Sequence, residues 1–285
     1  MKKYLALLLT GALALGIVGC GQSKEEGTDA DAAPTKEAEA EGEAVTLKVG
    51  ASPTPHAEIL EAAKEELAAK GITLQIVEFT DYVQPNLALD SGDLDANYFQ
   101  HTPYLDSFNE EQGTKIVSLG FVHYEPMGIY SASITDLAEL PEGAKVGIPA
   151  DGTNGGRALL LLEENGLITL NSDAGISATK LDIAENPKNI EIVEMEAAQL
   201  PLSLGDLGIA VINGNYAMQN GLKVEDALAI EAADSLAATT YANVVAVREG
   251  DETRPELITL LEVLNGQTVA DFINNTYGGA VAPTA

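Results

Sequence analysis

Short apolar runs alternate with amphipathic segments along residues 45–285, and this alternation is typical of an α/β protein with crossover helices. The amphipathic segment after the first run carries an inner apolar stripe of Ile59, Ala63 and Leu67. Thr54 is predicted to cap this helix, with Pro55 at its first position and Gly71 at its end. Further apolar runs predict strands at residues 45–51, 72–79, 115–122, 145–149, 190–193, 207–213 and 244–248, with a closing helix near residues 255–275.

The composition is that of a chain that buries a sizeable core. Of the 285 residues, 46% are apolar and 21% are charged, which excludes a collagen, a coiled coil and wholesale disorder. Residues 45–285 are numerous enough to form two lobes. The 44 acidic residues against 15 Lys and Arg give a net charge of −29, which would repel a phosphate backbone. Nucleic-acid binding is therefore excluded as a main function.

The N-terminal segment has the features of an export signal. Lys2 and Lys3 precede an apolar run at residues 4–18 that is short for a membrane-spanning helix. The following residues, Ile-Val-Gly-Cys at 17–20, resemble the bacterial lipobox, in which the cysteine becomes the lipidated N-terminus. We expect residues 1–19 to be removed and Cys20 to anchor the chain on the extracytoplasmic side of the cell membrane. An ordinary signal peptide that happens to contain a cysteine is the alternative.

Residues 20–44 form a different kind of segment. Eight acids, two lysines and almost nothing apolar beyond alanine follow Cys20, so this stretch cannot offset its ordering entropy. It is expected to be a disordered tether.

Aromatic residues gather in two neighbouring segments, 79–86 and 95–105. A local core is the simpler explanation for any one ring. The polar residues Asn97, Gln100, His101 and Thr102 in the second segment indicate a cleft instead. An aromatic box beside His101 would hold an apolar or thioether side chain.

Two further segments bring polar groups to predicted strand ends, where ligands settle in open α/β sheets. The glycine-rich stretch 149–157 leads into a helix expected to begin near Thr153, with Arg157 in its first turn. Free amides at that helix start attract anions, and the fork of Arg157 can bind a carboxylate bidentately. A surface ion pair with Glu163 or Glu164 is the alternative for this arginine. Asn213 ends one predicted strand and Asn243 directly precedes another. Each side-chain amide offers both a hydrogen-bond donor and an acceptor.

These segments together carry a family resemblance. Their order resembles the methionine-binding lipoproteins of the NlpA/MetQ family, the substrate-binding proteins of ABC importers. The resemblance covers essentially the whole chain after the tether, in the segments DYVQPN (81–86), DANYFQHTPYL (95–105), TNGGRALLLL (153–162), AENPKNIEIVEMEAAQLP (184–201), AVINGNYA (210–217) and YANVVAVRE (241–249).

The resemblance implies a two-lobed periplasmic-binding-protein fold of type II, with both lobes α/β and the ligand in the cleft. The lobes are expected at residues 45–130 with 240–285 and at residues 131–239, with hinges near residues 129–131 and 236–241. It also implies capture of methionine, L-methionine first of all, and delivery to the permease and ATPase of an importer. D-methionine, methionine sulfoxide or a methionine-containing dipeptide would also satisfy the pocket.

The resemblance assigns individual residues to the two ends of the ligand. Arg157 would take the α-carboxylate, and Asn213 and Asn243 would hold the backbone end. No acid is securely assigned to the ammonium, for which Glu125 is the one candidate. The side-chain pocket would be lined by Tyr82, Phe99, His101 and Tyr104.

Two other classes of function compete with a binding protein. An enzyme would use His101 with Asp106 or Glu125 as acid and base, but the sequence has no Gly-x-Ser-x-Gly or His-Glu-x-x-His motif and no thiol except Cys20. We expect no enzymatic activity and no cofactor. The three histidines are spread along the chain, so a metal site is not expected. A surface adhesin would lack a ligand cleft and would leave Arg157 unexplained.

Overall fold

The computed structural model describes residues 44–232 and 239–284. The predicted signal peptide, Cys20 and all of the predicted tether except Ala44 lie outside the described residues. Within them the chain forms a six-stranded sheet, a five-stranded sheet and a two-stranded ribbon. No helix in this part of the chain combines the length and apolar character needed to cross a bilayer.

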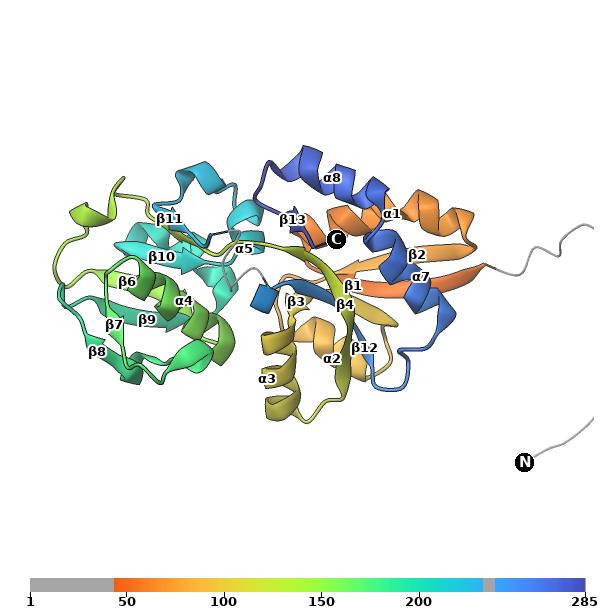
Figure 1. Cartoon of the computed structure of the whole chain (residues 1–285), viewed down its shortest axis with the longest axis horizontal. Coiled ribbons are helices and arrows are strands. Elements are labelled where there is room, and N and C mark those ends of the chain that lie inside the picture. Colours follow the sequence, from red (N-terminus) through yellow and green to blue (C-terminus); the bar gives the residue numbers. More distant parts are fainter. Residues whose placement is uncertain (1–43, 233–238, 285) are drawn as a thin grey trace, which may run out of the picture. The chain divides into compact units, whose positions relative to one another are not determined.

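The first sheet has the order β13-β4-β12-β3-β1-β2. β1 is parallel to both β2 and β3, whereas β12 is antiparallel to β3 and β4. Helices α1, α7 and α8 cover one face and α2 and α3 the other (Figure 1). These elements are β1 (Val45–Ala51), α1 (Glu58–Ala69), β2 (Ile72–Glu78), α2 (Gln84–Asp90), β3 (Ala96–His101), α3 (Thr102–Gln112), β4 (Ile116–Tyr124), β12 (Asn243–Arg248), α7 (Pro255–Leu264), α8 (Gln267–Tyr277) and β13 (Ala282–Pro283).

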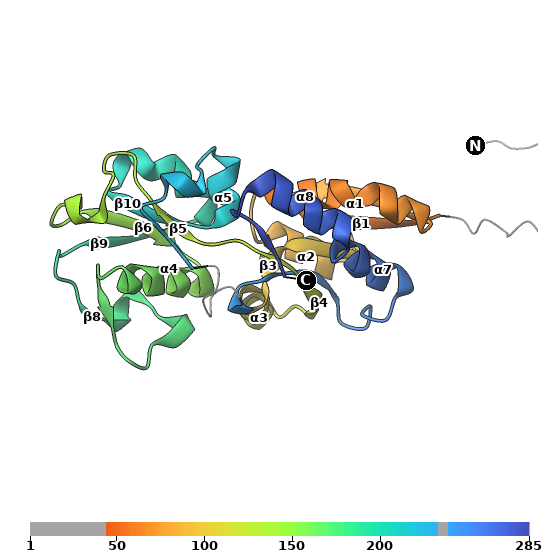
Figure 2. The same cartoon turned by 45° about the horizontal axis from the view of Figure 1, so that its top comes forward.

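The second sheet has the order β11-β5-β10-β6-β9, with β6 parallel to β9 and β10 and β5 antiparallel to its neighbours. Helices α4 and α5 lie on opposite faces of this sheet (Figure 2). The elements are β5 (Gly128–Tyr130), β6 (Lys145–Pro149), α4 (Gly152–Glu164), β9 (Glu191–Met195), β10 (Ile209–Ile212), α5 (Gly214–Gln219) and β11 (Ala229–Ile230), and the ribbon is β7 (Thr169–Leu170) with β8 (Ile183–Glu185). Short helical turns lie at Leu137–Glu139, Gly175–Ser177, Lys180–Asp182, Ala197–Gln199, Pro201–Asp206 and Val224–Asp226.

Each of the two sheets packs against its own helices around a separate apolar core. α1 buries Ile59, Leu60, Ala63 and Leu67 against the first sheet, so the predicted stripe is confirmed. α4 buries Leu159 and Leu162 against the second. The chain is therefore a two-lobed α/β protein.

The chain crosses between the sheets twice. β4 lies in the first sheet and β5 in the second, so the first crossing lies between Tyr124 and Gly128. This is slightly before the predicted hinge at 129–131, which falls largely within β5. The return runs from β11 to β12, and residues 233–238 of it lie outside the described residues. The division into lobes after residues 130 and 239 stays a prediction.

Three local expectations differ from the structure. α1 begins at Glu58 and not after Thr54, because Pro53–Ala57 forms a wider turn in which the Thr54 hydroxyl donates to Glu58 Oε1 at 2.6 Å. The closing helix is two helices, α7 and α8, which break at Asn265 and Gly266. Residues 96–101 form a wholly buried strand, β3, that the apolar pattern did not mark because half of its residues are polar.

Candidate functional site

A pocket opens between the two lobes, where the ends of β3, β10 and β12 meet the start of α4. All seven of the ligand-binding residues predicted from the sequence line it. Its walls are Tyr82, Phe99, Gln100, His101, Tyr104, Glu125, Asn154, Arg157, Asn213, Gly214, Asn215 and Asn243. Their roles toward a ligand stay predictions, but the structure brings them to one place.

Aromatic rings form one wall of the pocket. Phe99 lies on β3 and Tyr104 on α3, and the ring of Tyr82 lies 5.8 Å and 5.6 Å from theirs. Tyr216 of α5 adds a ring 4.8 Å from Tyr82. The first lobe thus supplies an apolar surface that the second lobe extends.

His101 joins the aromatic wall to the polar side of the pocket. Its Nδ1 accepts from the amide of Tyr104 at 3.2 Å, capping α3, so Nε2 carries the proton and donates to Asn154 Oδ1 at 3.1 Å. Burial, together with the charge of Arg157, lowers the pKa of His101 to about 3. The ring is therefore neutral at physiological pH and is a poor general acid.

The start of α4 is already capped. Asp151 accepts from the amide of Asn154 at 2.8 Å and from its side chain at 2.9 Å. The expectation that free amides here attract an anion is therefore wrong, because the chain supplies its own carboxylate. Asn154 is held in place, and its Oδ1 also accepts from Asn213 Nδ2 at 2.7 Å.

Arg157 is buried and lies in the second turn of α4, since the helix begins at Gly152. Its Nε and Nη2 donate to the two oxygens of Glu231 at 2.7 and 2.5 Å, and Nη2 also donates to the carbonyl of Glu125 at 2.9 Å. The alternative of a surface pair with Glu163 or Glu164 is excluded. The bidentate edge of the guanidinium is also occupied, so a ligand carboxylate would meet Nη1.

Two buried polar atoms at the pocket lack a partner. Within the described residues, neither Oδ1 of Asn213 nor Nδ2 of Asn215 makes a hydrogen bond. A buried acceptor and a buried donor each cost free energy when unpaired. Both residues line the pocket, so a ligand with an ammonium and a carboxylate can supply what is missing.

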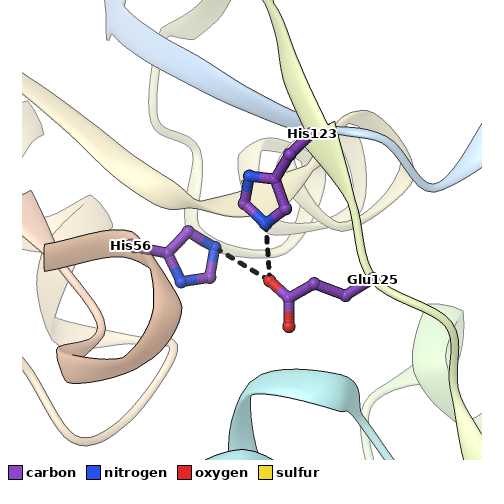
Figure 3. A group of neighbouring side chains, drawn as sticks. All are labelled: His56, His123 and Glu125. Atoms are coloured by element: carbon purple, nitrogen blue, oxygen red, sulfur yellow. Dashed lines mark hydrogen bonds and ion pairs between the residues drawn. The ribbon is translucent and has the colours of Figure 1, made fainter. Parts of the chain in front are cut away.

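Glu125 lies where the chain leaves β4, between two histidines (Figure 3). His123 Nε2 is 2.8 Å and His56 Nε2 is 3.3 Å from Glu125 Oε1. The hydroxyl of Tyr98 is bonded to His123 Nδ1, which leaves Nε2 to donate to the carboxylate. Burial lowers the pKa of His56 to about 4 and of His123 to about 3, and it raises the pKa of Glu125.

The three side chains also form a set of metal donors. One ligand atom of each lies within 4.8 Å of the others, and two imidazoles with a carboxylate can hold a divalent cation such as Zn²⁺. The hydrogen bonds described above account for the arrangement without an ion. The expectation of no metal site stays a prediction.

One part of the cleft prediction is wrong. Asn97 belongs to a buried amide cluster beneath α2, in which its Nδ2 donates to Asn86 Oδ1 at 2.8 Å. Gln100 donates to the same oxygen at 2.7 Å and reaches the pocket as well. Polar residues can therefore be core residues here, because they satisfy one another.

Comparison with known proteins identifies the chain. The model of the NlpA lipoprotein family matches residues 47–285. The chain belongs to the NlpA lipoprotein family. The D-methionine-binding lipoprotein MetQ of Salmonella typhimurium is 38% identical over 98% of both chains. The methionine-binding lipoprotein MetQ of Bacillus subtilis is 42% identical over 84% of this chain and 88% of its own.

Solved structures agree with this family assignment. A nutrient-binding protein from Burkholderia cenocepacia, bound to methionine, has a TM-score of 0.80 and 44% identity over 84% of this chain and all of its own. MetQ itself, in a crystal structure, has a TM-score of 0.80 and 39% identity over 84% of this chain and 97% of its own.

Some residues at the site of this NlpA-family protein were missed from the sequence. Asn154 and Asn215 lay in segments that were singled out but were given no role. Glu231 was not singled out at all, since one acid among 44 in Ile-Glu-Ala-Ala carries no local signal. Its importance comes only from Arg157, which lies 74 positions earlier and meets it in the fold.

Proposed function

We propose that this NlpA-family protein binds methionine in the pocket between its lobes and delivers it to an ABC-type importer. The observation that carries the proposal is one pocket with an aromatic wall at one end and a buried arginine with unpaired amide groups at the other. The relatives' names, and the methionine bound in the related structure, support the same ligand. A free amino acid with an apolar side chain fits both ends.

The aromatic end suits a thioether. Sulfur–ring contacts stabilise by roughly 0.3–1.5 kcal/mol each, and the rings of Tyr82, Phe99 and Tyr104 lie within 6.2 Å of one another. His101 contributes a neutral edge, because its pKa lies far below physiological pH. In this proposal the methionine side chain lies among these four residues.

The polar end suits the zwitterion. Arg157 Nη1 receives the α-carboxylate, since the other edge of the guanidinium is bonded to Glu231. Asn213 Oδ1, an acceptor without a partner among the described residues, receives the ammonium, and Glu125 supplies negative charge nearby. Asn243 begins β12, and its Oδ1 lies 3.0 Å from His56 Nε2. The imidazole fixes the amide, whose Nδ2 is then free to donate to the ligand.

Anchoring and delivery complete the proposal. Cys20 carries the lipid, the acidic segment before Val45 spans the distance to the folded part, and a permease with its ATPase receives the ligand. Cys20→Ala should release an intact protein from membranes, because the lipid is the anchor. Retention of this variant in membranes through detergent-free washing would exclude that anchor.

The first test uses the ligand that the protein carries. Purified protein is unfolded and the released small molecules are analysed by mass spectrometry. The proposal predicts methionine, and a chiral column then separates L- from D-methionine. If methionine sulfoxide or a methionine-containing dipeptide is released instead, the proposed ligand is wrong but the proposed binding pocket stands.

A second test measures thermal stability of ligand-free protein with each amino acid. A ligand that binds only the folded state stabilises by RT ln(1 + [L]/Kd), or about 2.7 kcal/mol at a hundredfold excess over Kd. Methionine should raise the unfolding temperature, and alanine or serine should have little effect. An adhesin without a ligand cleft would show no shift with any of them.

A further inference from the structure

The carboxylate of Glu231 is held by three separate parts of the chain, namely α4 of the second lobe, the end of β4 in the first sheet and the crossing that follows β4. It accepts two hydrogen bonds from Arg157 of α4, one from the Tyr124 hydroxyl at 2.7 Å and one from the Met127 amide at 2.8 Å. The side chain is 6% exposed. Burial alone would raise the pKa of Glu231, but the charge of Arg157 holds it below its usual value. The group is therefore a fixed negative charge.

Glu231 in turn fixes the guanidinium of Arg157. The ring of Tyr241 lies over it, with its centroid 4.4 Å from Cζ, and the Glu125 carbonyl accepts from Nη2. Among the described residues no hydrogen bond reaches Nη1. Arg157 lines the pocket and Glu231 does not. The ligand therefore contacts an arginine whose positive charge is neutralised by a carboxylate outside the pocket.

The charges around the pocket then favour a neutral zwitterion. Arg157 is the one cation among the lining residues, Glu231 neutralises it, and Glu125 adds a further carboxylate. His101 is neutral at physiological pH. An anionic ligand would enter a buried site with no net positive charge and would leave the acceptor Oδ1 of Asn213 unpaired.

We propose that Glu231 determines the charge class of the ligand: by compensating Arg157 from outside the pocket, it admits zwitterionic α-amino acids and excludes their anionic counterparts that lack the ammonium. The proposal rests on the proposed function, because it concerns the same pocket. Glu231 is a positioning residue, acting through Arg157 without touching the ligand.

The test compares three probes of similar size by calorimetry on ligand-free protein. They are L-methionine, the zwitterion; its 2-hydroxy analogue, an anion; and L-methioninol, a cation. In the unmodified protein the anion should bind more weakly than the cation. If L-methionine itself does not bind, the proposed function fails; if it binds but the anion equals or exceeds the cation, only this inference fails.

Glu231→Gln removes the charge and keeps the size. A unit charge within several ångströms at an effective dielectric constant near 20 changes relative affinity by roughly tenfold or more. In this variant the ratio of the affinity for L-methionine to the affinity for its hydroxy analogue should fall by about that factor. The anion gains affinity because a negative charge is removed, while the zwitterion loses affinity because Arg157 is no longer well placed. If the ratio of these two affinities is unchanged in the variant, the proposal is overturned, even when both probes bind more weakly.

Two controls separate charge from structure. Glu164→Gln makes the same charge change on an exposed position of α4 and should leave the ratio unchanged. Glu231→Asp keeps the charge and should keep the exclusion of the anion, whatever it does to affinity. If Glu231→Gln does not fold, an anion that binds the unmodified protein as tightly as the cation still overturns the proposal, and Glu231→Asp must keep the preference for the cation.

Discussion

The hydroxyl of Tyr82 donates a hydrogen bond to Oδ1 of Asn215 at 2.6 Å, and it thereby joins the aromatic wall of the first lobe to the start of α5 in the second. Nδ2 of the same side chain has no hydrogen-bond partner among the described residues, and Asn215 lines the pocket. The predicted hinges imply that the lobes close on the ligand, and a bond that joins the two lobes favours the closed arrangement. We therefore expect this bond to couple closure to the arrangement of a polar group at the ligand.

Tyr82→Phe should weaken methionine binding by about threefold to tenfold, which is the net value of one hydrogen bond of roughly 1 kcal/mol. The loss should be in the dissociation rate, because the bond stabilises the closed form. Tyr104→Phe is the matched control, since its hydroxyl bonds to a carbonyl within the same lobe, that of Tyr82, at 3.2 Å. Equal effects of the two variants on dissociation would contradict the role of Tyr82 in closure.

The two ends of the pocket should respond differently to truncation. Arg157→Ala removes a charge-assisted contact and leaves the buried Glu231 without its counter-ion, at a cost on the order of 2–5 kcal/mol, so every amino-acid ligand should weaken alike. Phe99→Ala removes apolar and sulfur–ring contact, so methionine should lose its advantage over alanine. Calorimetry with both amino acids measures this. Unchanged methionine affinity in either variant would remove that residue from the site.

Buried histidines predict how stability depends on pH. In the folded protein the pKa of His56 is lowered to about 4, and those of His101 and His123 to about 3, mainly by burial, from an ordinary value of 6.5. Below pH 6.5 the unfolded chain binds protons that the folded chain does not. Stability is therefore full above that pH and falls as the pH drops toward 4, by about 1.4 kcal/mol per pH unit for each histidine at most.

Buried carboxyl groups oppose this trend. The raised pKa of Glu125 means that the folded state takes up a proton at a higher pH than the unfolded chain, which adds stability as the pH falls. Burial raises the pKa of Asp151 as well, so two carboxyls oppose the trend, and the three histidines outweigh them. Urea unfolding from pH 8 to pH 5 should show a plateau above pH 7 and a decline below it, and His101→Asn should make the decline shallower. A flat profile from pH 7.5 to 5 would contradict neutral, buried imidazoles.

The second glycine of the pair in α4 is required by close packing. A Cβ on Gly156 would lie 2.4 Å from the carbonyl oxygen of Ile176, which is backbone and cannot turn aside. Gly156→Ala should cost about 1–3 kcal/mol in the free energy of unfolding. Gly152→Ala, on the same helix with nothing within 4 Å, should be neutral or slightly stabilising. Similar unfolding midpoints in urea would show that the packing is looser than described.

Sequence patterns predicted the fold where burial and polarity agree. The apolar runs at β1 and β6 and the stripe on α1 were found with the right bounds to within a few residues, because their periods follow burial directly. β3 was missed as a strand, since the amides of Asn97 and Gln100 are buried there by pairing with Asn86. Hydrophobic periodicity does not record such pairing.

The site shows the same division. The aromatic residues and Arg157 stand in local clusters that the sequence displays. Glu231, which decides how Arg157 can act, lies far along the chain and has no local feature. The partner of a buried charge depends on the fold, and a single sequence contains no direct signal of it.

A crystal structure of the folded part with L-methionine tests the central claim most directly. The account predicts the thioether between the rings of Tyr82 and Phe99, and the α-carboxylate on Nη1 of Arg157 with the Glu231 pair intact. The ammonium should lie at Asn213 Oδ1. Methionine bound elsewhere, or in this pocket with its carboxylate away from Arg157, would contradict the account.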